Sequence, residues 1–364
     1  MTEKLQLLLL FGGQSCEHEV SVTSARSMIN AINDKRFQIV AAGITRQGEW
    51  LVPNDIEQVF STGYVSSDAG IPVYLDYSSS GCLRGMDNPE YQKKIDVVFP
   101  LLHGTNGEDG ALQGLLELAN VAYVGSGVGG SAVGMDKELM RKAFDFVGLE
   151  QTQWRMVHDW QFVEEPDRLL DKIMQDLEFP LFIKPSSQGS SVGISKAHDR
   201  EGLSAAITEA LRFDYKAMIE QSIEDAHEVE CAVLGNDRPC ASVVGEIIPG
   251  AEFYNYQTKY IDDKSQLVIP AELPAEFAEQ IRAQSILAFE AVSASGLSRV
   301  DFLVRPENNQ IVINEINTMP GFTPISMYPK LWQHSGIEYA DLIDRLVDLG
   351  IARHQSKTDR NSGL

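Results

Sequence analysis

The segment LQLLLLFGG, residues 5–13, constrains the fold more than any other part of the chain. Its apolar run is too short to span a membrane and ends in two glycines, as is typical of a parallel strand buried on both faces. Strand-like segments then alternate with helical patterns, which predicts an α/β domain with a parallel sheet over residues 1–125. The strand-like segments are 5–11, 37–44, 95–104 and 121–125, and the helical ones are 21–33 and 110–120.

Residues 50–94 interrupt this alternation. They are rich in Ser, Gly and Asp, and we expect an irregular insertion there. The remaining chain is predicted to form two more units, 126–219 and 220–364. Their main elements are a helix over 135–148, a strand–loop–strand unit over 179–197, a hairpin over 227–249, a long helix over 274–293, a hairpin over 300–317 and a C-terminal helix.

The last hairpin turns polar where its second strand ends. Glu315 and Asn317 are two residues apart, so an extended chain points them to one face. A five-residue loop over 306–310 would pair Arg305 with Ile311, and the same register places Asp301 opposite Glu315 and Arg299 opposite Asn317. Facing carboxylates repel unless a cation lies between them, and oxygen-only ligands suit Mg²⁺. A solvated strand end and a different register are the alternatives.

The loop KPSSQGSSVG joins two apolar strands. Its glycines and serines, Ser190 and Ser191 among them, allow the backbone to approach phosphate closely, and Lys184 could pair with phosphate charge. The P-loop pattern is absent, because the lysine precedes the loop. A flexible hairpin turn is the alternative.

Two further loops follow strands of the first sheet. FGGQSCEHEVS lacks the dinucleotide pattern, and its Glu17 and Glu19 suit a ligand ammonium better than a pyrophosphate, with helix capping as the alternative. His103, in LLHGTNGEDGALQG, could act as a base, although a single loop histidine is more often structural.

Composition excludes some classes of protein. The formal net charge is −22, which argues against a nucleic-acid-binding surface. Hydrophobic residues make up 43% and charged residues 23% of the 364, as is typical of a soluble globular chain. The cysteines show no CxxC spacing, so we expect free thiols in a reducing compartment, the cytoplasm. They are Cys16, Cys82, Cys231 and Cys240.

Seven short motifs occur along the chain in an order that is informative about its family. They are GGQSCEHEVS, LHGTNGEDG, MDK, KPSSQGSSVG, KYID, SRVDF and NEINTMPG. This series resembles the D-alanine–D-alanine ligases of the ATP-grasp superfamily, from about residue 5 to residue 350. The resemblance implies a Rossmann-like domain over 1–125 and two α+β domains, 126–219 and 220–364, that clamp ATP. It also implies a homodimer that binds neither nucleic acid nor membrane.

The implied reaction joins two D-alanine molecules for peptidoglycan precursor synthesis. ATP activates the carboxylate of the first as an acyl phosphate, and the amine of the second attacks it, giving the dipeptide, ADP and phosphate. Asp301, Glu315 and Asn317 match ligands of two Mg²⁺ ions, for which Mn²⁺ could substitute. The nucleotide-binding positions that match are Lys137, Lys184, Ser191, Glu220 on the adenine side, Glu228 at the ribose, and Lys259.

The substrate positions match as well. Glu17 corresponds to the acid that orients the ammonium of the first D-alanine, with Ser190 and Tyr260 as its hydrogen-bonded partners, and His103 falls in the same site. Arg299 and the backbone of Gly321 correspond to the oxyanion-stabilising groups. Ser326 and Met327 correspond to the acceptor-carboxylate site.

The segment over residues 250–266 is polar and aromatic, and we expect a lid that orders over bound nucleotide. Related ligases that make D-alanyl-D-lactate carry a histidine in place of Tyr260, so this tyrosine predicts D-alanine as the acceptor. The alternatives are a ligase that makes D-Ala-D-Ser or D-Ala-D-Lac, and a nucleotide-binding module without catalysis.

Overall fold

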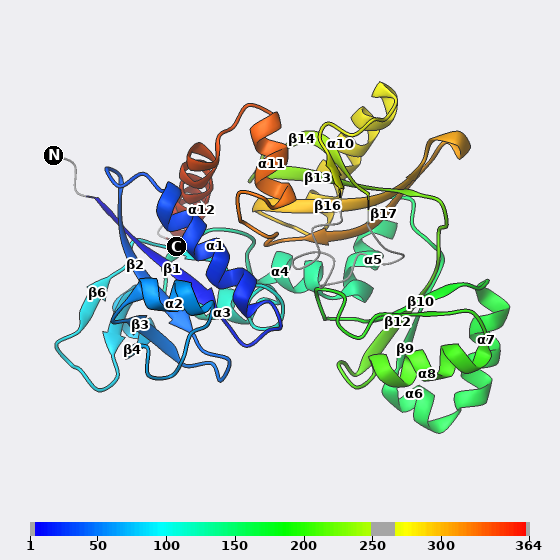
Figure 1. Cartoon of the computed structure of the whole chain (residues 1–364), viewed down its shortest axis with the longest axis horizontal. Coiled ribbons are helices and arrows are strands. Elements are labelled where there is room, and N and C mark those ends of the chain that lie inside the picture. The colour runs from blue at the N-terminus through cyan, green and yellow to red at the C-terminus, as the bar shows by residue number, and fades with distance from the viewer. Residues whose placement is uncertain (1–3, 249–265, 362–364) are drawn as a thin grey trace.

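The structure is a computed structural model that describes residues 4–248 and 266–361 of the 364-residue chain. Within these ranges the strands form sheets of eight, four and five strands. The eight-stranded sheet forms one end of the molecule, and the other two sheets lie together at the opposite end (Figure 1). This is the mixed α/β, three-sheet arrangement expected of an ATP-grasp protein.

The first sheet has the order β6-β5-β4-β3-β2-β1-β7-β8 and is parallel from β2 to β8. Strand β1 (Leu5–Gly12) is buried on both faces. Leu7 and Leu9 belong to one hydrophobic cluster, whereas Leu8 and Leu10 belong to another. This confirms the predicted parallel strand. The other parallel strands are β2 (Phe37–Ile44), β7 (Val97–Pro100) and β8 (Ala122–Tyr123), with helices α1 (His18–Ala31) and α3 (Ala111–Leu118).

The prediction of an irregular insertion over residues 50–94 was wrong. The segment adds antiparallel strands to the edge of the first sheet. Composition misled because the hydrogen-bond partners of these strands come from the edge of an existing sheet, which composition does not report. The elements are β3 (Trp50–Pro53), α2 (Ile56–Thr62), β4 (Gly70–Asp76), η1 (Tyr77–Ser79), β5 (Cys82–Gly85) and β6 (Gln92–Lys94).

The second sheet has the order β11-β10-β12-β9 and is antiparallel throughout. Helices α7 and α8 supply Leu170, Ile173, Leu203 and Ile207 to a hydrophobic cluster with its strands. The unit border expected after residue 219 falls inside β12. The elements are β9 (Trp154–His158), α6 (Asp159–Glu164), α7 (Pro166–Asp176), β10 (Leu181–Pro185), β11 (Ser195–Ala197), α8 (Arg200–Ala210) and β12 (Lys216–Gln221).

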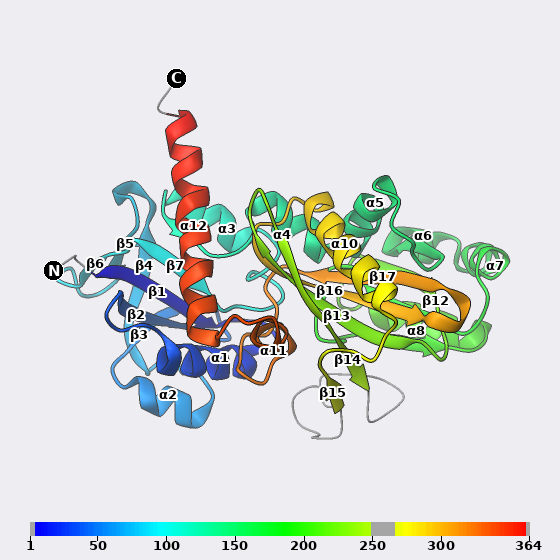
Figure 2. The same ribbon diagram turned by 90° about the horizontal axis from the view of Figure 1, so that it is seen from above.

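The third sheet has the order β15-β14-β13-β16-β17. Helix α10 packs on it, and helix α5 adds Met140 and Phe144 to the same hydrophobic cluster (Figure 2). The elements are α4 (Val128–Met135), α5 (Lys137–Phe146), β13 (His227–Gly235), β14 (Cys240–Ile248), β15 (Gln266–Val268), α10 (Ala275–Ala291), β16 (Gly296–Arg305), η2 (Pro306–Asn308) and β17 (Gln310–Asn317).

The chain then returns to the first sheet. Helix α11 (Met327–His334) packs on β13 and β14, and helix α12 (Tyr339–Asn361) packs along β7 and β8 (Figure 2). One hydrophobic cluster runs from β1 through Phe322, Tyr328 and Leu346, so the first and third sheets share a continuous core.

The register of the β16–β17 hairpin differs from the predicted one near its turn. Arg305 pairs with Gln310, not with Ile311, because the loop is one residue shorter than expected. A bulge between Asp301 and Phe302 then shifts the register by one residue. The predicted pairs of Asp301 with Glu315 and of Arg299 with Asn317 are therefore present.

The cysteines Cys16, Cys82, Cys231 and Cys240 are free thiols, as the sequence predicts. Among the described helices, none is long and apolar enough to cross a membrane.

Candidate active site

A cavity of about 1660 Å³ opens where the three sheets converge. All of the predicted site residues that the structure describes line it. Lys259, Tyr260 and nearly all of the expected lid lie outside the described residues. The lining residues from the predicted set are Glu17, His103, Lys137, Lys184, Ser190, Ser191, Glu220, Glu228, Arg299, Asp301, Glu315, Asn317, Gly321, Ser326 and Met327.

Arg299 is buried in the cavity wall and is held by two acids. Its Nε and Nη2 donate to the two carboxylate oxygens of Asp301, each at 2.7 Å, and its Nε also lies 2.9 Å from Glu230 Oε2. Burial opposes the charge of Arg299, but Asp301 and Glu230 outweigh it and raise the pKa well above its ordinary value. The guanidinium is therefore a fixed, permanently charged donor.

The predicted metal ligands lie together on the paired strands β16 and β17. Asp301 faces Glu315, and the amide of Asn317 donates to Asp301 at 3.1 Å. No cluster of three or more His, Cys, Asp or Glu arranged for a metal ion occurs within the ranges that the structure describes. The set here instead combines two carboxylates with one amide, and this hard oxygen chemistry fits Mg²⁺.

Glu220 is a buried counter-ion on β12. Its carboxylate accepts from Arg141 Nη2 at 2.5 Å and from Thr152 Oγ1 at 3.3 Å, and it forms an ion pair with Lys184. Burial raises the pKa of Glu220, but the charges of Lys184 and Arg141 lower it by more than burial raises it. The net shift of the pKa is therefore downward. Lys184 also donates to Asn314 Oδ1 at 3.5 Å, which connects the second and third sheets.

The Gly/Ser loop reaches across the cavity toward Glu17. Ser190 and Ser191 adopt left-handed backbone conformations, with φ of 50° and 60°. A Cβ on Gly189 would lie 3.6 Å from Glu17 Oε2, so the loop passes close to this carboxylate. Glu17 precedes α1 and makes no side-chain capping bond, which removes the capping explanation for this residue. Glu19 instead lies in the first turn of α1 and pairs with Arg46.

Lys137 is buried at the start of α5. Its Nζ donates to the carbonyl of Gln188 in the loop at 2.7 Å. Burial lowers the pKa of Lys137, the charge of Glu315 raises it, and Lys184 lowers it again, with a net downward shift. Lys137 and Lys184 are close enough to affect each other's charge, and an anionic ligand between them would be favoured by both.

His103 and Glu108 hold the backbone of Met319 from the first domain. Met319 N–H donates to Glu108 Oε1 at 3.1 Å, and His103 Nδ1 donates to the Met319 carbonyl at 3.0 Å. A carbonyl only accepts, so the proton resides on Nδ1. Among the described residues, none forms a hydrogen bond with the buried Nε2. This clamp supports the segment that contains Gly321.

Glu108 has an unusual environment. Its carboxylate also accepts from Gly104 N–H at 2.6 Å, which favours the charged form. Burial and the neighbouring charge of Glu17 nonetheless raise the pKa of Glu108 to about 8. The side chain is therefore largely protonated at neutral pH.

Ser326 and Met327 lie at the start of α11. Ser326 is the N-cap residue, and its hydroxyl accepts from Thr323 N–H at 3.1 Å and lies 2.8 Å from Thr323 Oγ1. The first helical amide groups and the helix dipole favour an anion at this position. A substrate carboxylate fits this end of the cavity.

Sequence reasoning missed Glu108, Glu230 and Arg141. Glu230 alternates with Val229 and Cys231 on β13 and pairs with Asp301 on β16, so the period-two pattern could have found it. Glu108 follows His103 in a loop already singled out. Arg141 had no sequence signal, because a basic residue in an amphipathic helix is normally exposed.

Comparison with known proteins decides the family. Two family models, described as "D-ala D-ala ligase N-terminus" and "D-ala D-ala ligase C-terminus", match residues 6–126 and 143–348. The chain belongs to the D-alanine–D-alanine ligase family. It is 47% identical to a D-alanine–D-alanine ligase of Acetivibrio thermocellus, over 97% of this chain and 98% of that relative. A relative with the same description from Geobacillus thermodenitrificans is 46% identical over 97% of each chain.

Solved structures of ligases have the same fold. The D-alanine–D-alanine ligase of Coxiella burnetii matches with a TM-score of 0.85 and 36% identity, covering 99% of this chain and 98% of that one. The VanG D-Ala:D-Ser ligase of Enterococcus faecalis also has a TM-score of 0.85, with 35% identity over 96% of this chain and 100% of that one. The predicted family and ATP-grasp fold are therefore confirmed.

Proposed function

We propose that this chain joins two D-alanine molecules into D-alanyl-D-alanine at the expense of ATP, through an acyl phosphate. The observation that carries the proposal is the convergence in one cavity of a Gly/Ser loop, buried lysines, oxygen ligands and a fixed arginine. A module that only binds nucleotide would not need Arg299 held toward a reacting centre.

The nucleotide side lies between the second and third sheets. Lys137, Lys184 and the loop N–H groups around Ser191 are assigned to the phosphates. Glu220 and Glu228 are assigned to the adenine and ribose ends, and the sequence adds Lys259 to the phosphate lysines. Glu220 already pairs with Arg141 and Lys184, so in this site it also organises the cations.

Asp301, Glu315 and Asn317 would hold two Mg²⁺ ions, for which Mn²⁺ could substitute. When bound, the metal supplies charge neutralisation for the phosphates. The protein contributes the bulged hairpin that places both carboxylates on the cavity face.

The D-alanine side lies between the first and third sheets. Glu17 is assigned to the ammonium of the first D-alanine, with Ser190 and Tyr260 as the predicted partners and His103 nearby. Arg299 and the Gly321 N–H are assigned to the tetrahedral oxyanion, because donors that are already fixed lose little free energy to reorganisation.

The acceptor carboxylate is assigned to Ser326 and the N-terminus of α11, including Met327. A largely neutral Glu108 holds the backbone of Met319 without adding a second negative charge beside Glu17. The bound acceptor must lose its ammonium proton before its nitrogen can attack the acyl phosphate.

A substrate panel tests the proposal. Phosphate release from ATP is measured with D-alanine, D-serine, D-lactate and L-alanine, and the products are identified by mass spectrometry. We expect release to depend on D-alanine and D-alanyl-D-alanine to dominate, in keeping with Tyr260. Release that ignores D-alanine would overturn ligation, and a dominant D-Ala-D-Ser or D-Ala-D-Lac product would overturn the acceptor assignment.

We also propose that the chain works in the cytoplasm as a homodimer. The free thiols support a reducing compartment, and the family resemblance supports the dimer. Light scattering coupled to size exclusion measures the mass directly, and a monomer mass at working concentration would contradict the dimer.

A further inference from the structure

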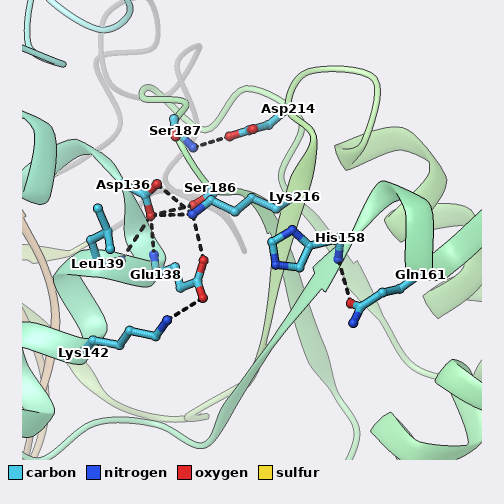
Figure 3. A network of polar contacts seen from close by, with 10 residues as sticks. All are labelled: Asp136, Glu138, Leu139, Lys142, His158, Gln161, Ser186, Ser187, Asp214 and Lys216. Carbon is cyan, nitrogen blue, oxygen red and sulfur yellow. Dashed lines mark hydrogen bonds and ion pairs between the residues drawn. The ribbon is translucent and has the colours of Figure 1, made fainter.

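Lys216 holds two carboxylates at the start of α5 (Figure 3). Its Nζ lies 2.7 Å from Asp136 Oδ2, 3.0 Å from Asp136 Oδ1 and 2.8 Å from Glu138 Oε2. Only 4% of Lys216 is exposed, although lysine is usually among the most exposed residues. The other oxygen of Glu138 pairs with Lys142, whose side chain is exposed. One buried ammonium therefore bridges two neighbouring acids.

Asp136 performs two further tasks with the same carboxylate. It caps α5 by accepting from the N–H groups of Glu138 and Leu139, at 3.0 and 3.1 Å. It also accepts from the hydroxyl of Ser186 at 3.2 Å. Ser186 follows strand β10 directly, at the start of the Gly/Ser loop. Without Lys216, Asp136 and Glu138 would repel each other at this junction.

The base of the loop is attached to the same residues. Lys137 N–H donates to the Ser186 carbonyl at 3.0 Å, and Ser186 N–H donates to the Lys216 carbonyl at 3.1 Å. Ser187 N–H donates to Asp214 Oδ2 at 2.7 Å. The start of β12 thus fixes both the loop and the residue next to Lys137.

The network lies outside the cavity and joins two sheets. Neither Lys216, Asp136 nor Glu138 lines the cavity. Lys216 begins β12 of the second sheet, whereas α5 packs through Met140 and Phe144 against the third sheet. The ion pairs therefore set the position of α5, and of Lys137 on it, relative to the loop that faces it.

We propose that Lys216 is a positioning residue for the nucleotide phosphates, acting through Asp136 on the Gly/Ser loop and on Lys137. This inference rests on the proposed function, because it takes the phosphates to bind at Lys137 and the loop. Loss of Lys216 should therefore weaken nucleotide binding more than it affects the D-alanine side.

Lys216 and Glu138 are both charged at neutral pH. Burial lowers the pKa of Lys216, but hydrogen bonds to Asp136 and Glu138 outweigh burial and raise it. For Glu138, burial raises the pKa, but Lys142 and Lys216 lower it to about 2. The variants below can therefore be compared at one pH.

Calorimetric titration with ADP and Mg²⁺ tests the inference, together with the KM values for ATP and D-alanine. We expect Lys216→Met to weaken ADP binding and raise the KM for ATP by roughly tenfold, since small misplacements of binding groups are costly. The KM for D-alanine should rise less, because the backbone hydrogen bonds of Lys216 and Lys137 to the loop are at Ser186, at its base, whereas Ser190 lies farther along it. Lys216→Arg should restore most of the ADP affinity, because it keeps the charge in this place.

Lys142→Met is the matched control, because Lys142 pairs with Glu138 but, within the described ranges, forms no hydrogen bond or ion pair with Asp136 or the loop. It should bind ADP like the wild type. Equal ADP affinity of Lys216→Met and Lys142→Met would overturn the inference, as would equal rises in both KM values.

If Lys216→Met does not fold, Asp136→Asn replaces it, since asparagine still caps the helix but cannot form the ion pair. The same loss of ADP affinity is expected, and wild-type affinity would overturn the inference. Failure of the proposed function is a separate outcome. It would appear as wild-type protein that binds ADP but releases no phosphate when D-alanine is added.

Discussion

Asp301 on β16 lies opposite Glu315 on β17, while the adjacent pair is Phe302 with Ile313, so Asn314 is an additional residue on β17. The bulge interrupts the alternation of the strand. Asn314 and Glu315 consequently both line the cavity, although consecutive residues of a regular strand point to opposite faces. Asn314 contacts Lys184, and Glu315 faces Asp301, so one extra residue connects Lys184 to the proposed metal site.

Glu315→Gln tests the proposed metal site. Glutamine keeps the size of the side chain but removes its charge, so we expect kcat to fall by roughly 100-fold or more while thermal unfolding is little changed. Glu307→Gln, in the exposed turn of the same hairpin, is the matched control and should retain activity. Normal turnover of Glu315→Gln at saturating Mg²⁺ would exclude the assignment.

Arg299→Lys tests the oxyanion assignment. Lysine keeps a positive charge between Asp301 and Glu230 but cannot donate two parallel bonds to Asp301. We expect kcat to fall by about 100-fold, with the KM for ATP affected less. Arg168→Lys, at an exposed surface pair on α7, is the control. The assignment would be rejected if the variant kept wild-type kcat in phosphate-release assays.

Glu108 predicts a specific dependence of stability on pH. Its pKa is about 8 in the folded chain and 4.5 as the ordinary value, so between these pH values the folded state binds more protons than the unfolded state. The stabilisation from this group is complete below pH 4.5 and is lost as the pH rises through 8.

The glutamine side chain in Glu108→Gln cannot ionise, so this variant should not show the loss of stabilisation that Glu108 causes as the pH rises. The free energy of unfolding of the wild type minus that of the variant should therefore fall between pH 5 and pH 8, with a slope of at most about 1.4 kcal/mol per pH unit, and then level off. Urea unfolding across this range measures it. A difference that does not vary with pH would show that Glu108 is not protonated in the folded chain.

Gly350 on α12 tests how the C-terminal helix is seated. A Cβ there would lie 2.6 Å from the Tyr123 carbonyl oxygen on β8. Alanine favours helices over glycine by about 1 kcal/mol, but this clash costs more, so Gly350→Ala should lower the free energy of unfolding by about 1–2 kcal/mol. In α3, a Cβ on Gly114 would meet no atom within 4 Å, and Gly114→Ala should stabilise the chain instead. Equal effects in urea unfolding would contradict the close packing of α12.

Local pattern alone determined much of the fold. The burial of β1, the helix over residues 275–291 and the β16–β17 hairpin follow from apolar runs and period-two alternation, because these patterns report directly which face meets the core. The motif order, by resemblance, also predicted the family and the residues that converge on the cavity. These signals are local, so they survive without knowledge of the tertiary contacts.

The tertiary structure decided the rest. The hairpin loop was one residue shorter than expected, and the Asn314 bulge offset that difference, because register depends on long-range pairing and not on turn length alone. Strands β3 to β6 form because the edge of an existing sheet supplies their hydrogen-bond partners, which polar composition cannot reveal. The raised pKa of Glu108, the fork of Arg299 on Asp301 and the buried charge of Lys216 each require atoms from distant segments to meet in a desolvated place. The sequence by itself predicted which residues line the candidate site, and only the folded chain decided their partners and their charges, since both depend on what surrounds each group.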